Sequence, residues 1–226
     1  MTERDAADDP LVQRLARLDT PTVSDALDSL GHRGAVFGIV PMTVERRIVG
    51  RAITVKLGPP IPGAPKRHLG VATINMAHAN DIIVVEHGRD DVSGWGGLLS
   101  RAAVAKGIAG VVIDGAFRDI DEARELGLAV YGRAAVPVTA RGRIAEHGFD
   151  VPVTIAGVSV DPGDLVLADG SGIVFVAASH AEETLRAAEA IAAKESLMAR
   201  DIDAGIPLDQ VLGANYEDML KGGAQS

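Results

Sequence analysis

The sequence predicts a fold of the mixed α/β class, and two observations carry this prediction. In the middle of the chain, short and wholly apolar runs at residues 82–85 and 110–113 alternate with segments of helical periodicity. Such runs are typical of strands that are covered on both faces, as in a parallel sheet. Further apolar runs, separated by turn residues, crowd the region 151–176. A βαβ-like middle followed by a strand-rich segment indicates a mixed α/β domain.

Each element has its own local signal, and the elements are expected in the following order. Helices are predicted near 10–18 and 22–30, the second with Pro21 in its first turn, where proline is tolerated. A strand near 50–57, a helix near 67–77 and a strand near 82–86 follow. Then come a helix over 98–106, a strand over 110–113 and a helix over 120–126. Strands are predicted near 129–132, 151–155, 165–168 and 172–176, and Ser179 and Glu182 predict a capping box for a long helix from about His180 to Arg200.

The composition predicts one domain over residues 1–226, with short flexible ends at about 1–9 and 221–226. Hydrophobic residues make up 47% of the chain and aromatic residues only 3%, so the core must be built from valine, isoleucine, leucine and alanine. No run of about eighteen uncharged apolar residues occurs, which predicts that the chain has no membrane span. The acidic start has no apolar stretch and the chain has no cysteine, so we expect a cytoplasmic protein without disulfides.

The charge balance argues against nucleic-acid binding. The formal net charge is −9, from 31 acidic and 22 basic residues. A chain of this balance has no broad basic face for phosphate backbones, and it has few aromatic residues to stack on bases. We therefore expect no nucleic acid among its partners.

The most informative segment is residues 93–127, which joins a glycine-rich turn, a helix, a short strand and a second helix. Arg118 and Asp119 follow the strand, at the edge of the sheet where ligands bind in open α/β folds. The planar fork of Arg118 suits a carboxylate, and Asp119 is an oxygen ligand suited to Mg²⁺ or Mn²⁺. The glycines of the turn allow close backbone approach, and the amides of Leu98 and Leu99 could bind an anion.

Together these features predict a small oxo-acid that is held on a divalent metal. The alternative is that Arg118 and Asp119 only cap and solvate the helix over 120–126, because acids at helix starts commonly do no more than interact with the helix dipole.

The whole arrangement resembles the signature of a known family. Gly97, twenty intervening residues, Arg118 and Asp119, two more residues and Glu122 are similar to the motif of the class II pyruvate aldolases, among them the 4-hydroxy-4-methyl-2-oxoglutarate and 4-carboxy-4-hydroxy-2-oxoadipate aldolases. These share a fold with the regulator of ribonuclease activity A, and together they form the RraA-like family. The segments LDTPTVSDALDSLG, IVGRAITVKLG and VDPGDLVLADGSGIVFV also look like landmarks of that family, so the resemblance covers roughly residues 15–205.

The resemblance implies a swivelling β/β/α layered domain that assembles as a homotrimer or a dimer of trimers, with sites at the interfaces between protomers. It also implies a lyase that depends on Mg²⁺ or Mn²⁺ and acts on a small 2-oxo acid. Retro-aldol cleavage releases pyruvate, or oxaloacetate is decarboxylated, through a metal-stabilised enolate. The alternative on the same fold is a noncatalytic regulator that binds a protein.

Site roles are carried over by the resemblance onto matching positions. Arg118 would bind the carboxylate and oxo group of the substrate and steady the enolate, and Asp119 would ligate the metal directly or through a water. The turn at Gly96 and Gly97 and the amides of Leu98 and Leu99 would hold the carboxylate. Glu122 completes the predicted catalytic set, which is Arg118, Asp119 and Glu122.

One position departs from the family pattern. Many aldolases of this family carry an acidic residue, which helps to hold metal-bound water, where this chain has Gly97. Glu122, Asp114 or an acid of a partner subunit would have to replace it, or the reaction differs within the same chemistry. Glu195 is a candidate partner acid, because C-terminal acids reach a neighbouring site in the family, although it could equally be an ordinary acid on a solvated helix face.

Other polar residues have open or structural readings. His87 follows the strand 82–86 and could either line the pocket or be structural. Lys56 and Lys66 are not marked as buried amines, so no Schiff base is expected. Asp161, Asp164 and Asp169 do not follow the order of ligands in a calcium loop and are expected to be structural turn residues.

Overall fold

The computed structural model describes residues 9–63 and 68–212. Its helices are α1 (Pro10–Leu15), α2 (Thr20–Ser29), α3 (Val71–Met76), α4 (Gly97–Ala105), α5 (Ile120–Glu125), α6 (Ala181–Asp203) and α7 (Leu208–Val211). Its strands are β1 (Ala35–Val36), β2 (Val40–Pro41), β3 (Ile48–Gly58), β4 (Ile82–Glu86), β5 (Gly110–Asp114), β6 (Ala116–Phe117), β7 (Val130–Gly132), β8 (Ala134–Ala135), β9 (Ala145–Phe149), β10 (Val153–Ile155), β11 (Val158–Val160), β12 (Leu165–Asp169) and β13 (Gly172–Val176).

A nine-stranded sheet organises the fold, with the order β1-β13-β12-β3-β4-β5-β7-β2 and with β9 added on β3. Its middle strands, β3, β4, β5 and β7, are parallel, and β12 and β9 run antiparallel to β3. β3 is long enough to serve two partners on one edge, because its first residues pair with β12 and its last residues pair with β9. Two small pairs, β10–β11 and β6–β8, lie outside this sheet.

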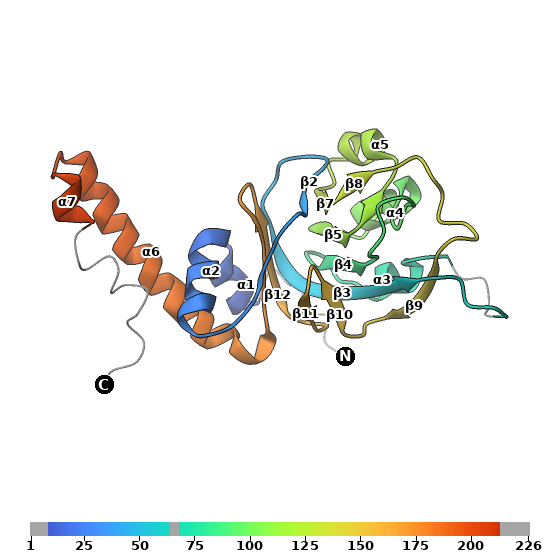
Figure 1. The fold of residues 1–226 in the computed structure, drawn as a ribbon, viewed down its shortest axis with the longest axis horizontal. Helices are drawn as coiled ribbons and strands as arrows, with labels where there is room; N and C mark the ends of the chain where they lie inside the picture. The colour runs from blue at the N-terminus through green and yellow to red at the C-terminus, as the bar shows by residue number, and fades with distance from the viewer. Residues whose placement is uncertain (1–8, 64–67, 213–226) are drawn as a thin grey trace.

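The alternation of side chains along the strands divides the core into separate clusters. Ile83 and Val85 of β4 point to a cluster beneath α3, α4 and α5, whereas Ile82 and Val84 point to a second cluster on the other face of the strand. β12 and β13 close this second cluster, and their opposite faces form a third cluster with α1, α2 and α6. The sheet therefore curls around the second cluster and carries helices on both outer sides (Figure 1).

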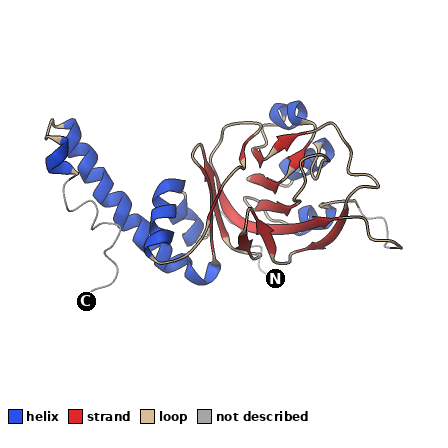
Figure 2. Ribbon diagram, in the orientation of Figure 1, coloured by secondary structure: helices blue, strands red, loops and turns tan. Residues whose placement is uncertain are grey.

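The helices are segregated as this layering requires. In Figure 2, α1, α2 and α6 gather on one side of the strands, and α3, α4 and α5 accompany the parallel strands on the other. α6 runs away from the body of the molecule and ends beside α7 (Figure 1). Among the described residues, we find no helix with both the length and the apolar character needed to cross a membrane.

Most predicted elements are confirmed, and the predicted mixed α/β class with them. The strands predicted near 82–86, 110–113, 165–168 and 172–176 occur as β4, β5, β12 and β13. The two-residue turn between β12 and β13 pairs Asp169 with Gly172. Of the flexible ends expected at 1–9 and 221–226, only Asp9 lies among the described residues, where it caps α1.

One local prediction is wrong, and several short strands went unrecognised. Ser179 lies in a 3₁₀ turn, so α6 begins at Ala181, and its N-cap is His180, which makes no side-chain capping hydrogen bond. The expected capping box of Ser179 and Glu182 does not form. Strands β1, β2, β6, β8, β9 and β11 were not predicted, since each is very short or, in β9, carries polar residues.

Candidate functional site

The glycine-rich turn at 93–97 is bound along its length to the segment that follows β5. Gly94 donates its backbone N–H to the carbonyl of Ala116 at 2.9 Å, and Arg118 donates its own to the carbonyl of Trp95 at 3.1 Å. These backbone bonds place the start of α4 directly beside Arg118 and Asp119. The structure therefore brings together the turn and the charged pair that the sequence singled out.

Asp119 spans the gap between the two helices. It occupies the N-cap position of α5 with φ 63°, in the left-handed region, yet its side chain makes no capping hydrogen bond to α5. Instead its Oδ2 accepts the backbone N–H of Gly97 at 2.8 Å and lies 3.4 Å from Nε of Arg118. A non-glycine residue held in this region is strained, and such strain is concentrated at functional sites. The side chain of Asp119 therefore makes no capping hydrogen bond to its own helix and binds the start of α4 instead.

Glu122 occupies the space that a side chain at position 97 would need. A Cβ built on Gly97 would lie 1.9 Å from Oε2 of Glu122, and one built on Gly96 would lie 3.0 Å from Oδ2 of Asp119. The other oxygen of Glu122 accepts a hydrogen bond from Arg101 at 2.8 Å. Glycine at position 97 and the carboxylate of Glu122 therefore form one spatial unit.

A cavity of about 520 Å³ opens beside this unit. It is lined by residues 118–122 and by Ala135, Val136 and Pro137. The side chains of Arg118 and Asp119 are 40% and 39% exposed, so both are accessible to a ligand. The loop after β8 was missed as a contributor, because small apolar residues in a loop carry no local signal of a site.

The first turn of α4 lies beside the cavity but not in its lining. The amides of Leu98 and Leu99 are in the first turn, where an α-helix offers them no carbonyl four residues back. The side chain of Leu98 is 76% exposed, whereas that of Leu99 is buried against the core. The amides of Leu98 and Leu99, which were predicted to bind an anion, therefore follow directly after Gly97, whose own N–H is bound to Asp119.

His87 lies behind the turn and is not part of the cavity lining. It is buried, its Nε2 lies 2.7 Å from the carbonyl oxygen of Val92, and its Nδ1 has no partner among the described residues. Burial lowers the pKa of His87. Its ring packs so closely on Gly94 and Gly115 that a Cβ on either would lie within 3 Å of it. Its position is that of a residue supporting the turn.

The acids at the strand ends have structural partners. Oε2 of Glu86 accepts the backbone N–H of Thr154 at 2.7 Å, and its Oε1 lies 3.2 Å from Nζ of Lys56. Asp114 binds Arg133 through one oxygen and accepts the N–H of Ala156 through the other. These bonds attach the β10–β11 hairpin to the ends of β4 and β5, and they leave Asp114 engaged away from Gly97.

Two other acidic residues, Asp164 and Asp169, also have structural partners. Asp164 accepts the backbone N–H of Asp161 and of Ala178, and Asp169 accepts both the amide and the hydroxyl of Thr20. Both are structural, as predicted. Lys66 falls outside the described residues.

Glu195 lies on the other side of the molecule within one chain. It is half-buried on α6, which packs on α1 and α2, opposite the helices that frame the cavity (Figure 1). Burial and the nearby carboxylates of Asp19 and Asp25 raise the pKa of Glu195. A single chain therefore does not bring Glu195 to Arg118.

Comparison with known sequences points to one family. The sequence model described as RraA-like, aldolase/RraA, matches residues 20–175. Protein DlpA of Legionella pneumophila is 28% identical over 201 residues, and the match spans 88% of this chain but only 33% of that protein. The 4-hydroxy-4-methyl-2-oxoglutarate aldolase of Thermus thermophilus is 41% identical over 81 residues, 36% of this chain and 49% of the aldolase.

Solved structures agree. An uncharacterized protein from Pseudomonas syringae pv. tomato superposes with a TM-score of 0.81 at 33% identity, covering 93% of this chain and 99% of that one. Streptomyces coelicolor RraAS2, described as an unusual member of the RNase ES inhibitor RraA family, superposes with a TM-score of 0.74 at 28% identity, covering 87% of this chain and 98% of that one. The family match covers residues 20–175 and so includes Gly97, Arg118, Asp119 and Glu122. It shows that this chain belongs to the RraA-like family.

Proposed function

We propose that this protein is a divalent-metal-dependent lyase that acts on a small 2-oxo acid, by retro-aldol cleavage that releases pyruvate or by decarboxylation of oxaloacetate. One observation carries the proposal. Arg118, Asp119 and Glu122 line one accessible cavity, and Asp119 is held there by the amide of Gly97 in a strained backbone conformation. Backbone strain of this kind is concentrated at functional sites, which supports the proposal.

Arg118 is the group we assign to the carboxylate and oxo oxygens of the substrate. Its guanidinium presents paired donors in a plane, which match the geometry of a 2-oxo carboxylate. The amides of Leu98 and Leu99 add donors at the positive end of the α4 dipole. The developing negative charge of an enolate would meet the same donors, which therefore favour the transition state over the ground state.

The donors present fit a hard divalent cation. Asp119 offers a carboxylate oxygen beside Gly97, and oxygen ligands suit Mg²⁺ or Mn²⁺. Because Oδ2 of Asp119 is bound to Gly97, we assign its Oδ1 to the metal. When bound, such a cation polarises the oxo group and neutralises charge on the enolate.

Glu122 is the residue we assign to the role of the acid that is absent at position 97. Its carboxylate stands where a side chain from position 97 would stand, whereas Asp114 is bound to Arg133 and Ala156. In retro-aldol cleavage, the C4 hydroxyl loses its proton and becomes the carbonyl of the second product as the C3–C4 bond breaks, and the electron pair of that bond passes into the enolate of pyruvate. Glu122 would take that proton, directly or through water, and the enolate would then be protonated at C3 to give pyruvate.

We further propose that the working unit is a homotrimer or a hexamer. The exposed apolar side chain of Leu98 beside the site, and those of Leu197, Ile202 and Leu208 along α6 and α7, supply surface for contacts between copies. In such an assembly Glu195 could reach a neighbouring site. Light scattering coupled to size-exclusion chromatography measures the state directly, and a monomer at micromolar concentration would contradict it.

The lyase is tested by measuring pyruvate release from 4-hydroxy-4-methyl-2-oxoglutarate and from oxaloacetate, with Mg²⁺ or Mn²⁺ and with EDTA. Because oxaloacetate also decarboxylates on free metal, Arg118→Ala is the necessary comparison. Arg186→Ala, an exposed arginine on α6 that pairs with Glu182, is the matched control. We expect metal-dependent turnover that is lost in Arg118→Ala and retained in Arg186→Ala. Equal rates in all three proteins would refute the proposal.

A second candidate function is a noncatalytic regulator that binds a protein, because RraAS2 is described as a member of a ribonuclease-inhibitor family. Turnover separates the two, since a regulator has no need of metal-dependent pyruvate release. Its binding would also survive Arg118→Ala unless the side chain lies in the interface.

A further inference from the structure

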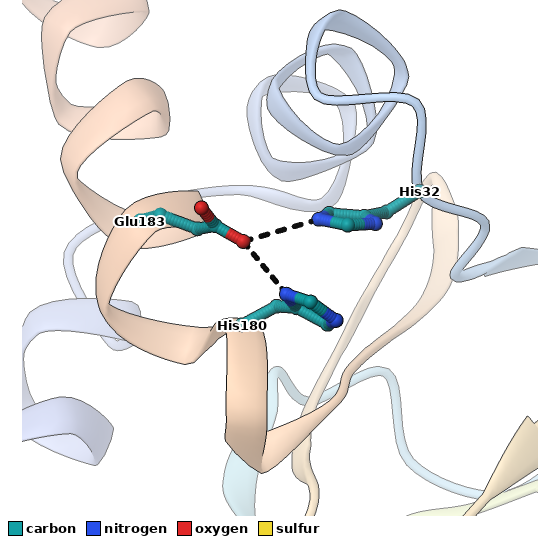
Figure 3. A group of neighbouring side chains, drawn as sticks. All are labelled: His32, His180 and Glu183. Carbon is teal, nitrogen blue, oxygen red and sulfur yellow. Dashed lines mark hydrogen bonds and ion pairs between the residues drawn. The ribbon is translucent and has the colours of Figure 1, made fainter.

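A second group of metal-binding side chains lies away from the cavity, at the junction of α2 and α6. Oε1 of Glu183 is 3.2 Å from Nε2 of His32 and 2.7 Å from Nδ1 of His180. One ligand atom from each residue lies within 4.8 Å of the other two. Figure 3 shows both imidazoles turned toward the same carboxylate oxygen. Nothing in the Gly97–Glu122 unit involves these residues.

The fold places these three side chains from two distant parts of the chain. His32 follows the C-terminal end of α2, and His180 and Glu183 stand at the start of α6. α2 and α6 pack together over one apolar cluster, which fixes the distance between their ends. The two rings stack with their centroids 4.0 Å apart and a tilt of 34°. The 3₁₀ turn that displaces the start of α6 to Ala181 puts His180 at the N-cap.

We propose that His32, His180 and Glu183 form a binding site for a borderline transition-metal cation, with Zn²⁺ as its most suitable occupant. Two imidazole nitrogens and one carboxylate oxygen are a donor set that suits Zn²⁺ and neighbouring first-row transition metals. It does not suit Mg²⁺, which prefers oxygen ligands. With zinc–ligand distances of about 2.0–2.2 Å, tetrahedral geometry separates the ligand atoms by about 3.4 Å. The two imidazole nitrogens lie 3.2 and 2.7 Å from Oε1 of Glu183, and all three ligand atoms lie within 4.8 Å of one another, so side-chain rotations would have to bring them to this spacing.

The site is accessible and leaves room for a further ligand. The side chains of His32, His180 and Glu183 are 28%, 43% and 49% exposed. A cation could therefore enter from solvent, and water could complete a four-coordinate shell. In the absence of metal, both imidazoles share one carboxylate oxygen, so metal binding replaces two hydrogen bonds with three metal bonds and releases any protons on the coordinating nitrogens.

Metal binding here would fasten α2 to α6. These helices form the layer over β12 and β13, and they meet through side chains of the third apolar cluster. A cation that binds the folded chain and not the unfolded one raises stability by mass action. The site would thus act on the stability of the helical layer, independently of the hard-cation chemistry proposed at Asp119.

The test uses untagged, EDTA-treated and dialysed full-length protein, titrated with Zn²⁺ near pH 7.5 by isothermal calorimetry. Variants His180→Asn and His32→Gln remove single ligands. His78→Asn is the matched control, because His78 also lies beside an acid three residues later, Asp81, but belongs to no such three-residue group among the residues that the structure describes. Asp119→Asn reports on zinc bound at the other site. Thermal unfolding with and without Zn²⁺ gives a second readout.

We expect one equivalent of Zn²⁺ per chain that depends on His32 and His180 and is retained in His78→Asn and in Asp119→Asn, with a Zn²⁺-dependent rise in Tm. Both the equivalent and the rise in Tm should be lost in His180→Asn and in His32→Gln, while their circular dichroism without metal stays that of the wild type. In NMR titrations, the imidazole nitrogen signals of His32 and His180 should shift together. The same number of Zn²⁺ equivalents in the wild type and in both ligand variants, or zinc binding that disappears only in Asp119→Asn, would overturn the proposal.

Discussion

Replacing Gly97 with alanine tests whether the carboxylate of Glu122 has taken the place of the missing acid. The new Cβ would lie 1.9 Å from Oε2 of Glu122 and 2.7 Å from its Cδ, which no pair of atoms tolerates. It would also lie 3.3 Å from Cβ of Asp119, a contact that a shift of a few tenths of an ångström relieves. Because Glu122 ends in a flexible side chain, its carboxylate must swing away while the backbone stays in place.

The cost in stability should be small. The swing breaks the exposed ion pair between Arg101 and Glu122, and such pairs contribute about 0.2–1 kcal/mol. Alanine is a better helix former than glycine at the start of α4, which offsets part of that loss. At about 2–4 °C per kcal/mol for a chain of this size, Tm should fall by no more than about 4 °C.

The cost in activity should be much larger. A displaced proton acceptor removes general acid–base assistance, which contributes about 10²- to 10⁴-fold. We therefore expect kcat/KM to fall by about 100-fold or more in an assay that couples pyruvate release to NADH oxidation. Gly170→Ala is the control, because a Cβ there meets nothing within 4 Å; it should keep full activity.

A double-mutant cycle shows whether the loss acts through Glu122. If alanine at position 97 acts by expelling that carboxylate, Gly97→Ala combined with Glu122→Ala should be no slower than Glu122→Ala alone. Wild-type kcat/KM in Gly97→Ala, or losses that add fully in the double variant, would refute the reasoning.

Three further predictions concern the folded state. Because burial lowers the pKa of His87, the unfolded chain binds a proton below about pH 6.5 while the folded chain does not. Between pH 7 and 5, the free energy of unfolding measured with urea should therefore fall less for His87→Gln than for the wild type. The same dependence of that free energy on pH in both proteins would contradict this. For Asp169, burial alone would raise the pKa, but the hydrogen bonds from Thr20 and Ser171 and the charge of Arg47 together outweigh burial and lower the pKa. Asp169 thus adds stability above about pH 4 that is lost as pH falls through the lowered pKa; Asp169→Ala should cost about 1–3 kcal/mol at pH 7, and a urea midpoint equal to that of the wild type would exclude it. Burial raises the pKa of Tyr131, whose hydroxyl donates to the carbonyl of Arg46, to about 12. In an ultraviolet titration of tyrosine ionisation, Tyr131→Phe should therefore remove a step well above pH 10. Loss of a step near pH 10 instead would count against the raised pKa of Tyr131.

The fold was predictable where the local signal was strong. β4 and β5 are apolar runs bounded by glycine or acidic residues, and both are buried on both faces as that pattern indicates. β9 was missed because its residues, AEHGF, do not alternate; it is a strand only because the far end of β3 offers it an edge. The capping box at Ser179 failed because a 3₁₀ turn competes for the same residues.

The candidate site was predictable in its parts and not in its assembly. Arg118 and Asp119 follow a buried strand, and the glycines precede a helix, so both segments were found from local sequence. That Asp119 would bind the start of α4 and not its own helix depends on how α4 and α5 meet. The same meeting places Glu122 over Gly97, and folds His87 behind the turn, which no local pattern could indicate.

The long strand β3 also constrains how the protein is made. Val55 pairs with Phe149 and Ile48 with Ala168, so both outer partners of β3 belong to the last part of the described chain. During synthesis, β3 leaves the ribosome well before β9 and β12 exist. Its antiparallel edge must stay unpaired for that time, and unpaired edges of apolar strands invite aggregation. Nascent chains halted before residue 145 should therefore depend on chaperones, whereas the finished chain closes that edge with its own strands.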